Sequence, residues 1–287
     1  MAAQTIAHQD RFLETVRNNL KDTLAASVIY REMHTEIDVL VSGKMLRSRL
    51  IHAIGSTRDT PPQQCIEAAT AVEMLHAASL LHDDVIDGGH LRRGAPALWV
   101  SRGSHVAILM GDMLLSLAFA KIAASQPHAV PVLADTLRMM CESEIAQASP
   151  SAPETMSWDD CIRIARGKTG SLFGFSAYCT ACDDAHLAQA LLHAGTQVGT
   201  AYQLADDLLD LQHDESVAGK TLGTDATTAK YTAATAWHSP GKSPQRLMQD
   251  HLDEAVSVLS PWNPVQQALQ TYIQSTLQPL IEVYTST

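Results

Sequence analysis

The stretch Leu80–Asp87 (LLHDDVID) and a second stretch, Leu204–Asp210 (LADDLLD), carry the same acidic pattern inside apolar, helix-like sequence. Side chains four residues apart lie on one face of a helix, so each copy directs its first and last carboxylates to the same side. Carboxylates packed this closely raise one another's pKa unless a cation lies among them. Oxygen-only ligands favour a hard cation such as Mg²⁺, which often binds through the phosphates of a substrate. The two copies therefore predict two metal-binding helix faces that together hold a diphosphate.

The alternative is that both copies are solvated charge clusters on the protein surface. Leucine, valine and isoleucine residues flank the aspartates in each copy, for example Leu81 and Val85 in the first and Leu208 in the second. Apolar neighbours at these positions indicate helices that are buried on part of their circumference, which favours a site over a solvated cluster.

Composition and patterning favour an all-α fold in a single domain over residues 1–287. Hydrophobic residues make up 46% of the chain, and Gly (15) and Pro (12) are few. Long Ala-, Leu- and Met-rich runs outnumber the Val-Ile-Thr alternation that is typical of strands, and no segment has the character of a long interdomain linker. We expect helices near 5–40, 44–56, 61–87, 105–125, 131–148, 157–183 and 185–212, followed by two more.

Charge and cysteine content restrict the partners and the compartment. A net charge of −11 argues against nucleic-acid binding, which needs a basic face. Five cysteines at irregular positions indicate a reducing compartment, and the N-terminus lacks the apolar core of a signal peptide, so we expect a cytoplasmic protein. The apolar segment Val106–Ala120 is shorter than the ~20 residues that span a bilayer and contains Asp112. We therefore expect a buried helix there and no stable membrane insertion.

Polar residues extend both acidic faces along their predicted helices. Spacings of three and four residues place His76 and Glu73 on the face of Asp83, and Gln203 on the face of Asp206. A polar face among apolar neighbours indicates either a ligand or hydrogen bonds between helices. For His76 or Gln203 taken alone, both interpretations stay open.

Basic residues accompany the acidic pattern at several points. Arginine pairs suit bidentate recognition of phosphate, and lysine supplies a mobile positive charge. Any one of them is typical of a protein surface, but their combination with two metal-binding faces indicates a phosphate site. They are Lys44 and Arg47, Arg92 and Arg93, Lys168 beside Thr169, Lys220 and Lys230.

Taken together, these motifs resemble those of the trans-isoprenyl diphosphate synthases, over nearly the whole chain. Leu80–Gly94 (LLHDDVIDGGHLRRG) is similar to the first aspartate-rich region of that family, and Tyr202–Leu211 (YQLADDLLDL) is similar to the second. The remaining matches, in family order, are Gly43–Arg47 (GKMLR), Gly111-Asp112, Glu142–Gln147 (ESEIAQ), Lys168-Thr169 and Gly219–Asp225 (GKTLGTD). The resemblance implies a large helical bundle of the isoprenoid synthase type around a central apolar cavity.

The resemblance also implies an activity, a cofactor and roles for the motif residues. The activity is head-to-tail condensation of isopentenyl diphosphate with an allylic diphosphate by a homodimer that uses Mg²⁺, three ions per active site. The implied metal-binding and catalytic surface comprises Asp83, Asp84, Asp87, Asp206, Asp207 and Asp210, with Asp83, Asp87 and Asp206 as direct ligands. The implied allylic diphosphate site comprises Arg92, Lys168, Thr169, Gln203, Lys220 and Lys230, of which Lys168 is also catalytic. The implied isopentenyl diphosphate site comprises Lys44, Arg47, His76 and Arg93.

Product length is expected to depend on the side chains about one turn before the first acidic motif. In the family that this chain resembles, a bulky aromatic residue there blocks growth of the product. Here the positions hold Ala78 and Ser79, so we expect a product longer than farnesyl diphosphate. The sequence leaves the primer, the final length and the pathway open.

Two other functions are compatible with the same fold. A non-catalytic subunit that modifies another synthase would have little reason to keep both acidic triads. A terpene cyclase usually has an Asn/Ser/Glu pattern in place of the second triad and lacks the isopentenyl-binding set, here Lys44, Arg47 and Arg93. The intact motifs therefore favour the synthase.

Overall fold

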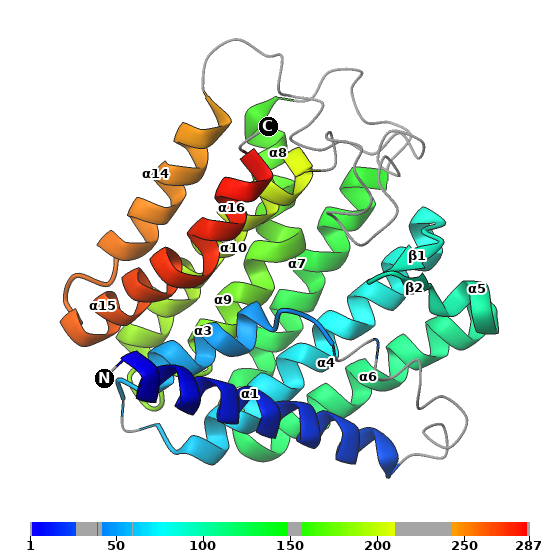
Figure 1. Cartoon of the computed structure of the whole chain (residues 1–287), viewed down its shortest axis with the longest axis horizontal. Coiled ribbons are helices and arrows are strands. Elements are labelled where there is room, and N and C mark those ends of the chain that lie inside the picture. Colours follow the sequence, from blue (N-terminus) through cyan, green and yellow to red (C-terminus); the bar gives the residue numbers. More distant parts are fainter. Residues whose placement is uncertain are drawn as a thin grey trace. The chain divides into compact units, whose positions relative to one another are not determined.

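The computed structural model of the chain is all-α, as the sequence predicts, and it describes residues 2–26, 39, 42–58, 60–148, 157–209 and 243–285 (Figure 1). The chain divides into two compact units, Met1–Val130 and Pro131–Thr287. The single domain expected over residues 1–287 stays a prediction. Three of the predicted site residues lie outside the described residues: Asp210, Lys220 and Lys230.

The first unit consists of long helices, one short hairpin and a 3₁₀ turn. Helix α4 runs through this unit and packs against α6, α3 and α1. The elements are α1 (Ala2–Ala25), α3 (Leu46–Gly55), α4 (Pro62–Asp87), β1 (Leu91–Arg92), β2 (Ala95–Pro96), α5 (Leu98–Arg102), α6 (Ser104–Ser125) and η1 (Pro127–Ala129).

Helix α4 begins and ends where the sequence predicts, and its end carries the first acidic motif. Pro62 lies in the first turn, where the missing N–H interrupts no hydrogen bond of the helix. Gly88 ends the helix with φ 65°, a left-handed conformation that glycine adopts without a steric penalty. The motif Asp83–Asp87 therefore occupies the last turn of α4, where the partial negative charge of the helix end favours a cation.

The sequence pattern does not predict the antiparallel hairpin of β1 and β2 that follows α4. Arg92 pairs with Ala95 across the hairpin. The two turn residues between them, Arg93 (φ 53°) and Gly94 (φ 75°), both have positive φ, as in the two-residue turns that match the twist of a hairpin. The hairpin thus gives Arg92 and Arg93 different backbone environments, one in a strand and one in a turn.

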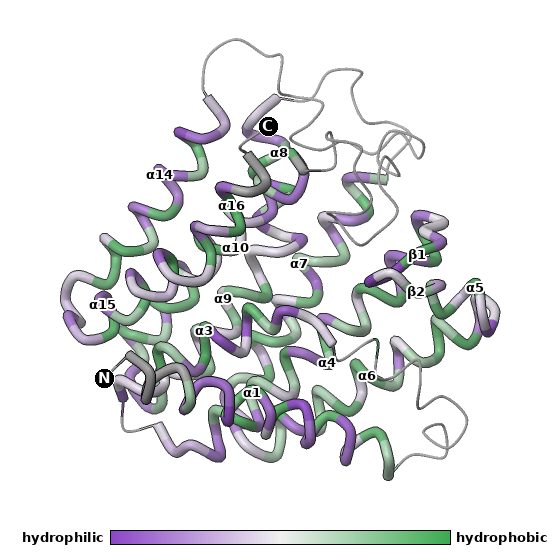
Figure 2. Tube along the Cα trace, viewed as in Figure 1, coloured by the Kyte–Doolittle hydropathy of each residue, from purple (hydrophilic) through white to green (hydrophobic). Residues whose placement is uncertain are grey.

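Helix α6 is buried on one face only, so the expectation of a buried helix at Val106–Ala120 is only partly correct. Gly111 and Leu114 are buried, while Leu109 is 65% exposed and Ile108 is 43% exposed. Apolar residues continue around much of the helix (Figure 2). In length and composition α6 meets the requirement for a membrane-spanning helix, but it contains Asp112 and packs along α4.

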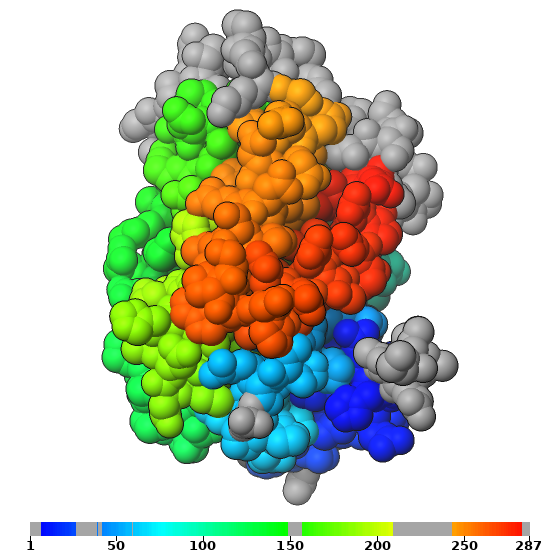
Figure 3. Space-filling view, turned by 90° about the vertical axis from the view of Figure 1, so that its left-hand side faces the viewer, coloured from blue at the N-terminus to red at the C-terminus, as the bar shows by residue number. Residues whose placement is uncertain are grey.

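The second unit is built around α10, which packs against α9, α14 and α16. Helices α14, α15 and α16 lie together on one face of this unit (Figure 3). The elements are α7 (Val130–Ala148), α8 (Trp158–Ala165), the π-helical turn η2 (Arg166–Gly170), α9 (Ser171–Tyr178), α10 (Ala185–Leu209), α14 (Pro244–Ser257), α15 (Asn263–Tyr272), η4 (Ile273–Leu277) and α16 (Gln278–Thr285).

Glycines let the backbone of α10 pack directly against the backbones of η2 and α9. A Cβ atom on Gly195 would lie 2.5 Å from the carbonyl oxygen of Phe173, and one on Gly199 would lie 2.8 Å from the Cα atom of Gly170. No side chain fits between such backbones. The close approach brings Thr169 on η2 within hydrogen-bonding reach of Gln203 on α10.

Replacing Gly195 by alanine is expected to lower the free energy of unfolding by about 2–3 kcal/mol, because the added methyl meets rigid backbone. Gly111→Ala is the matched control. A Cβ atom there would lie 2.2 Å from Nε2 of His82, but that neighbour is a side chain that can rotate away, so a loss of about 1 kcal/mol or less is expected. Urea denaturation of both variants makes the comparison. Equal losses would contradict the close helix contact at Gly195.

Candidate active site

Two of the three aspartates of the first acidic motif are partly exposed, although Oδ1 of Asp87 is buried. Asp83 and Asp87 lie one helical turn apart on α4 and are both partly exposed. Asp84, between them, is only 3% exposed. The motif therefore has two partly exposed aspartates, Asp83 and Asp87, and one buried aspartate, Asp84.

Arg92 of β1 binds the buried member of the motif. Its Nε donates to Oδ1 of Asp84 at 3.0 Å and to Oδ2 at 3.3 Å, and Nη2 also donates to Oδ1. Burial raises the pKa of Asp84 above its usual value, although the hydrogen bonds from Arg92 oppose this shift. The structure thus pairs a residue predicted for the metal surface with one predicted for the allylic diphosphate.

Three arginines and a histidine of the first unit form a positive region. Burial lowers the pKa of His76 well below its usual value, and the charges of Arg47, Arg93 and Arg92 add to this effect in that order. Three charges that act on one imidazole must lie close to it, so the structure brings together residues predicted for the two diphosphates. Such a concentration of positive charge favours binding of an anion.

The glycine of the Gly43–Arg47 motif has a steric function. A Cβ atom on Gly43 would lie 2.4 Å from Nη2 of Arg93, so a larger residue there would force this guanidinium to move. Nη1 of Arg93 donates to the carbonyl oxygen of Val39 at 2.7 Å. The contacts tie the hairpin turn to the segment that carries Lys44, whose side chain is exposed.

Glu73 and Ser48 join this region, and the sequence did not indicate that they act together. Both the backbone N–H and the hydroxyl of Ser48 donate to Oε1 of Glu73, at 3.3 Å and 2.7 Å. The spacing of Glu73 from His76 places it on the polar face of α4, but only the packing of α3 on α4 identifies its partner. Glu73 also opposes the lowering of the pKa of Arg93, which is caused mainly by burial.

The second unit repeats the division between accessible and buried aspartates. Asp206 is partly exposed, whereas Asp207 is 9% exposed. Nε2 of Gln203 donates to Oδ1 of Asp207 at 2.6 Å, and the hydroxyl of Thr169 donates to Oε1 of Gln203. The second aspartate of this motif is therefore also linked to residues predicted for the allylic diphosphate.

Lys168, beside Thr169, is held by α7. Its ammonium forms an ion pair with Glu144 and donates to Oε1 of Gln147 at 3.1 Å. The family resemblance implies a role for neither partner, although both lie in the motif Glu142–Gln147. The π-helical turn η2 brings Gly167 against Ser143, whose Oγ would lie 1.8 Å from a Cβ atom on Gly167.

The accessible carboxylates fit a hard divalent cation. Asp83 and Asp87 offer oxygen ligands only, and they lie at a helix C-terminus. Within the described ranges, no three Asp, Glu, His or Cys side chains converge on one point. Two carboxylates completed by waters and substrate oxygens are the coordination that Mg²⁺ commonly has in phosphate-binding proteins.

The two positions expected to influence product length lie on α4. Ala78 is fully buried, and Ser79 is partly exposed with its hydroxyl donating to the carbonyl oxygen of His76 at 2.9 Å. Both side chains are small, so neither position carries the bulky aromatic residue that would block product growth.

Comparison with known proteins adds independent information. A family model described as polyprenyl synthetase matches residues 30–257. The nonaprenyl diphosphate synthase of Mycobacterium tuberculosis is 35% identical over 170 residues, which are 58% of this chain and 50% of that protein, so the chain spans about half the length of this relative. The probable farnesyl diphosphate synthase of Bradyrhizobium diazoefficiens is 32% identical over 267 residues, 88% of this chain and 78% of that protein.

Solved structures share the architecture. A polyprenyl synthase from Caulobacter crescentus, complexed with calcium and isoprenyl diphosphate, superposes with a TM-score of 0.78 at 25% identity over 95% of this chain and 96% of that one. The fold is thus that of the all-α isoprenoid synthases. With the family match and both acidic motifs in place, the chain belongs to the polyprenyl synthetase family, the trans-isoprenyl diphosphate synthases.

Proposed function

We propose that this protein is a prenyltransferase that joins isopentenyl diphosphate head-to-tail to an allylic diphosphate with the help of Mg²⁺, and that it acts in the cytoplasm. The observation that carries the proposal is the arrangement repeated in both units. Each unit has an accessible aspartate at the end of a long helix and a buried aspartate that is hydrogen-bonded to a side chain able to bind phosphate. In the first unit this side chain is Arg92; in the second it is Gln203, which also accepts from Thr169. The two units act as one domain in the same reaction.

The accessible aspartates are proposed to hold the metal ions. Asp83, Asp87 and Asp206 are the direct ligands, and Asp210 completes the second motif. Mg²⁺ held there, three ions in this proposal, would neutralise the charge that develops on the departing diphosphate as the allylic carbon–oxygen bond lengthens. Asp84 and Asp207 position the neighbouring phosphate-binding groups.

The basic residues divide between the two substrates. Lys44, Arg47, His76 and Arg93 bind isopentenyl diphosphate, and Arg92, Lys168, Thr169, Gln203, Lys220 and Lys230 bind the allylic diphosphate. The double bond of isopentenyl diphosphate forms the new carbon–carbon bond, and the proton released from it passes to the departed diphosphate. No protein side chain is needed as general base.

The product is proposed to be longer than farnesyl diphosphate. The small side chains of Ala78 and Ser79 support this, since neither blocks an extending chain. The relatives in the comparison carry the names of both a nonaprenyl and a farnesyl synthase, so the family match alone does not select a length.

The protein is also proposed to form a homodimer through α6. Three apolar side chains of this helix are exposed in the single chain: Val106 (37%), Ile108 (43%) and Leu109 (65%). Burying such a face against a second copy removes apolar surface from water. Leu109→Glu is expected to convert the dimer to a monomer in sedimentation velocity, and a wild-type monomer would contradict the proposal.

Product analysis tests the activity. Purified protein is incubated with Mg²⁺, labelled isopentenyl diphosphate and, separately, dimethylallyl, geranyl or farnesyl diphosphate. We expect Mg²⁺-dependent products longer than farnesyl diphosphate. Products that stop at farnesyl diphosphate would keep the enzyme class and contradict the length argument. Folded protein that forms no product from any primer would overturn the proposed activity and favour a non-catalytic partner subunit.

A further inference from the structure

Met45 has a backbone conformation that is unusual for its residue type. It precedes α3 with φ 52° and ψ 44°, the left-handed region in which a Cβ atom crowds the following carbonyl group. Among the described non-glycine residues, Met45, Arg93 and Cys182 have positive φ. Arg93 belongs to the predicted isopentenyl diphosphate site, and Met45 lies in sequence between two further members of it, Lys44 and Arg47. Strained backbone often marks a functional site.

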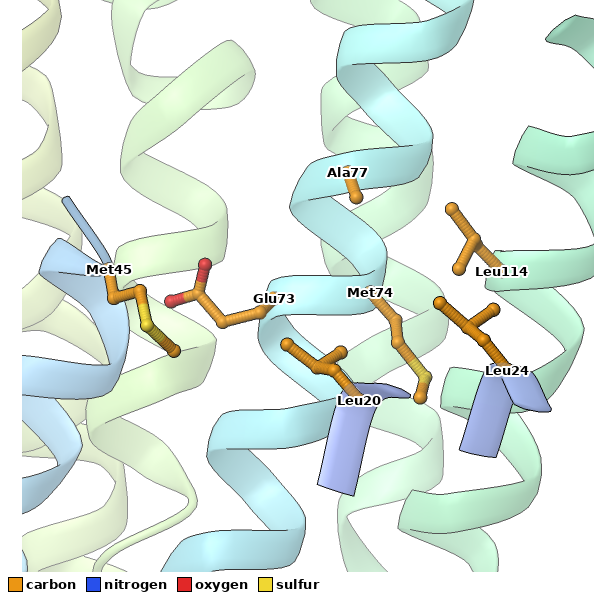
Figure 4. A pocket seen from close by; sticks show the side chains of 7 residues that line it. All are labelled: Leu20, Leu24, Met45, Glu73, Met74, Ala77 and Leu114. Carbon is orange, nitrogen blue, oxygen red and sulfur yellow. The ribbon is translucent and has the colours of Figure 1, made fainter. Parts of the chain in front are cut away.

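The side chain of Met45 is buried and lines a pocket of the first unit. It is 4% exposed. Figure 4 shows it on one side of the pocket beside Glu73, with Met74 and Leu114 on the other side. The remaining lining residues are Leu20, Leu24 and Ala77. Burial of this side chain in the core of the first unit therefore offsets its unfavourable backbone conformation.

The backbone around Met45 is fixed on both sides. Its carbonyl oxygen accepts from the N–H of Arg49 at 2.9 Å, and the carbonyl oxygen of Lys44 accepts from Nε of Arg49 at 3.1 Å. Ser48, one turn into α3, is held by Glu73, which lines the same pocket. With α3 fixed to α4, the torsion angles of Met45 decide where Lys44 lies relative to Arg47.

We propose that Met45 is a positioning residue for isopentenyl diphosphate. Its buried side chain keeps residue 45 in the left-handed conformation. This conformation sets Lys44 and Arg47 at the spacing that one diphosphate requires. The inference rests on the proposed function and adds to it a residue that contacts no substrate.

Replacing Met45 by alanine and by glycine separates the backbone effect from the loss of side-chain volume. Met45→Ala removes the anchor but keeps the steric cost of the left-handed conformation, so the Kd for isopentenyl diphosphate is expected to rise about tenfold. Met45→Gly removes even more volume, but glycine adopts this conformation freely, so a rise of about threefold or less is expected. The KM for the allylic substrate should stay unchanged in both variants.

Met74→Ala is the matched control, because it removes the same side chain from the same pocket on a regular helical backbone. We expect it to lower the thermal stability and leave the Kd for isopentenyl diphosphate unchanged. Calorimetric titration with isopentenyl diphosphate and thermal unfolding are measured for all three variants and the wild type.

The outcomes separate this inference from the proposed function. A glycine variant that binds as weakly as the alanine variant, or a Met74→Ala variant with the same binding defect, would overturn the positioning role while the wild type stays active. A wild type that binds no isopentenyl diphosphate would overturn the proposed function and with it this role. Weak binding by Met45→Ala that is recovered in Met45→Gly supports the inference.

Discussion

Asp83→Ala is expected to lower kcat about 1,000-fold or more, because it removes a carboxylate that helps to hold the metal as negative charge develops on the leaving diphosphate. Asp83 lies in the last turn of α4, partly exposed, one turn from Asp87. The measurement is incorporation of labelled isopentenyl diphosphate at saturating substrate, over a range of Mg²⁺ concentrations. Mg²⁺-dependent binding of inorganic diphosphate, followed by calorimetry, gives a second readout that does not depend on turnover.

Asp253→Ala is the control for this variant. Asp253 is an exposed aspartate of α14 that accepts a hydrogen bond from Gln249 at 2.7 Å, away from the acidic motifs in the sequence. It should keep the kcat and the Mg²⁺ dependence of the wild type. An Asp83→Ala variant with a kcat within tenfold of the wild type would remove this residue from the proposed ligands.

Asp84→Ala is expected to have a different defect, because Asp84 is buried and bound to Arg92. Removing one partner of a buried ion pair leaves the other charge uncompensated, so the free energy of unfolding should fall by about 3 kcal/mol. The released Arg92 should also bind the allylic diphosphate less well, which raises the KM for that substrate. Chemical denaturation and steady-state kinetics measure the two effects.

A double-mutant cycle tests whether Asp84 acts through Arg92. If it does, Arg92→Ala alone gives a similar rise in the allylic KM, and the double variant is little worse than either single variant. Fully additive effects, or a loss of Mg²⁺ affinity in Asp84→Ala as large as in Asp83→Ala, would instead make Asp84 a metal ligand.

Both chemistry-bearing helices follow from local sequence. The Pro61-Pro62 start, the Gly88 end and the apolar spacing of α4 predict its bounds, and the structure confirms them. The four-residue spacing places Asp83 and Asp87 on one face of α4 regardless of what packs against it. The distribution of alanine and leucine predicts an all-α chain, also confirmed. These features depend on propensity and periodicity, which act within one helix.

Only the tertiary structure determines the hydrogen-bond and ion-pair partner of each polar side chain. It turns Asp84 toward Arg92, although Asp83, Asp84 and Asp87 read alike in the sequence. It also forms the hairpin that separates Arg92 from Arg93. Helix periodicity assigns a residue to a face but does not say how deeply that face is buried, because burial depends on the neighbouring segments.

The backbone conformation of Met45 is a second feature that the local sequence does not predict. Nothing in the motif Gly43–Arg47 distinguishes Met45 from a helix-forming residue. Only the packing of the first unit buries its side chain while its backbone is left-handed. By itself, the sequence determined the helices, the acidic faces and the family. The packing of distant segments determined which aspartates are accessible and which partners the basic side chains bind. The reason is that burial and strain arise from contacts between residues far apart in the chain.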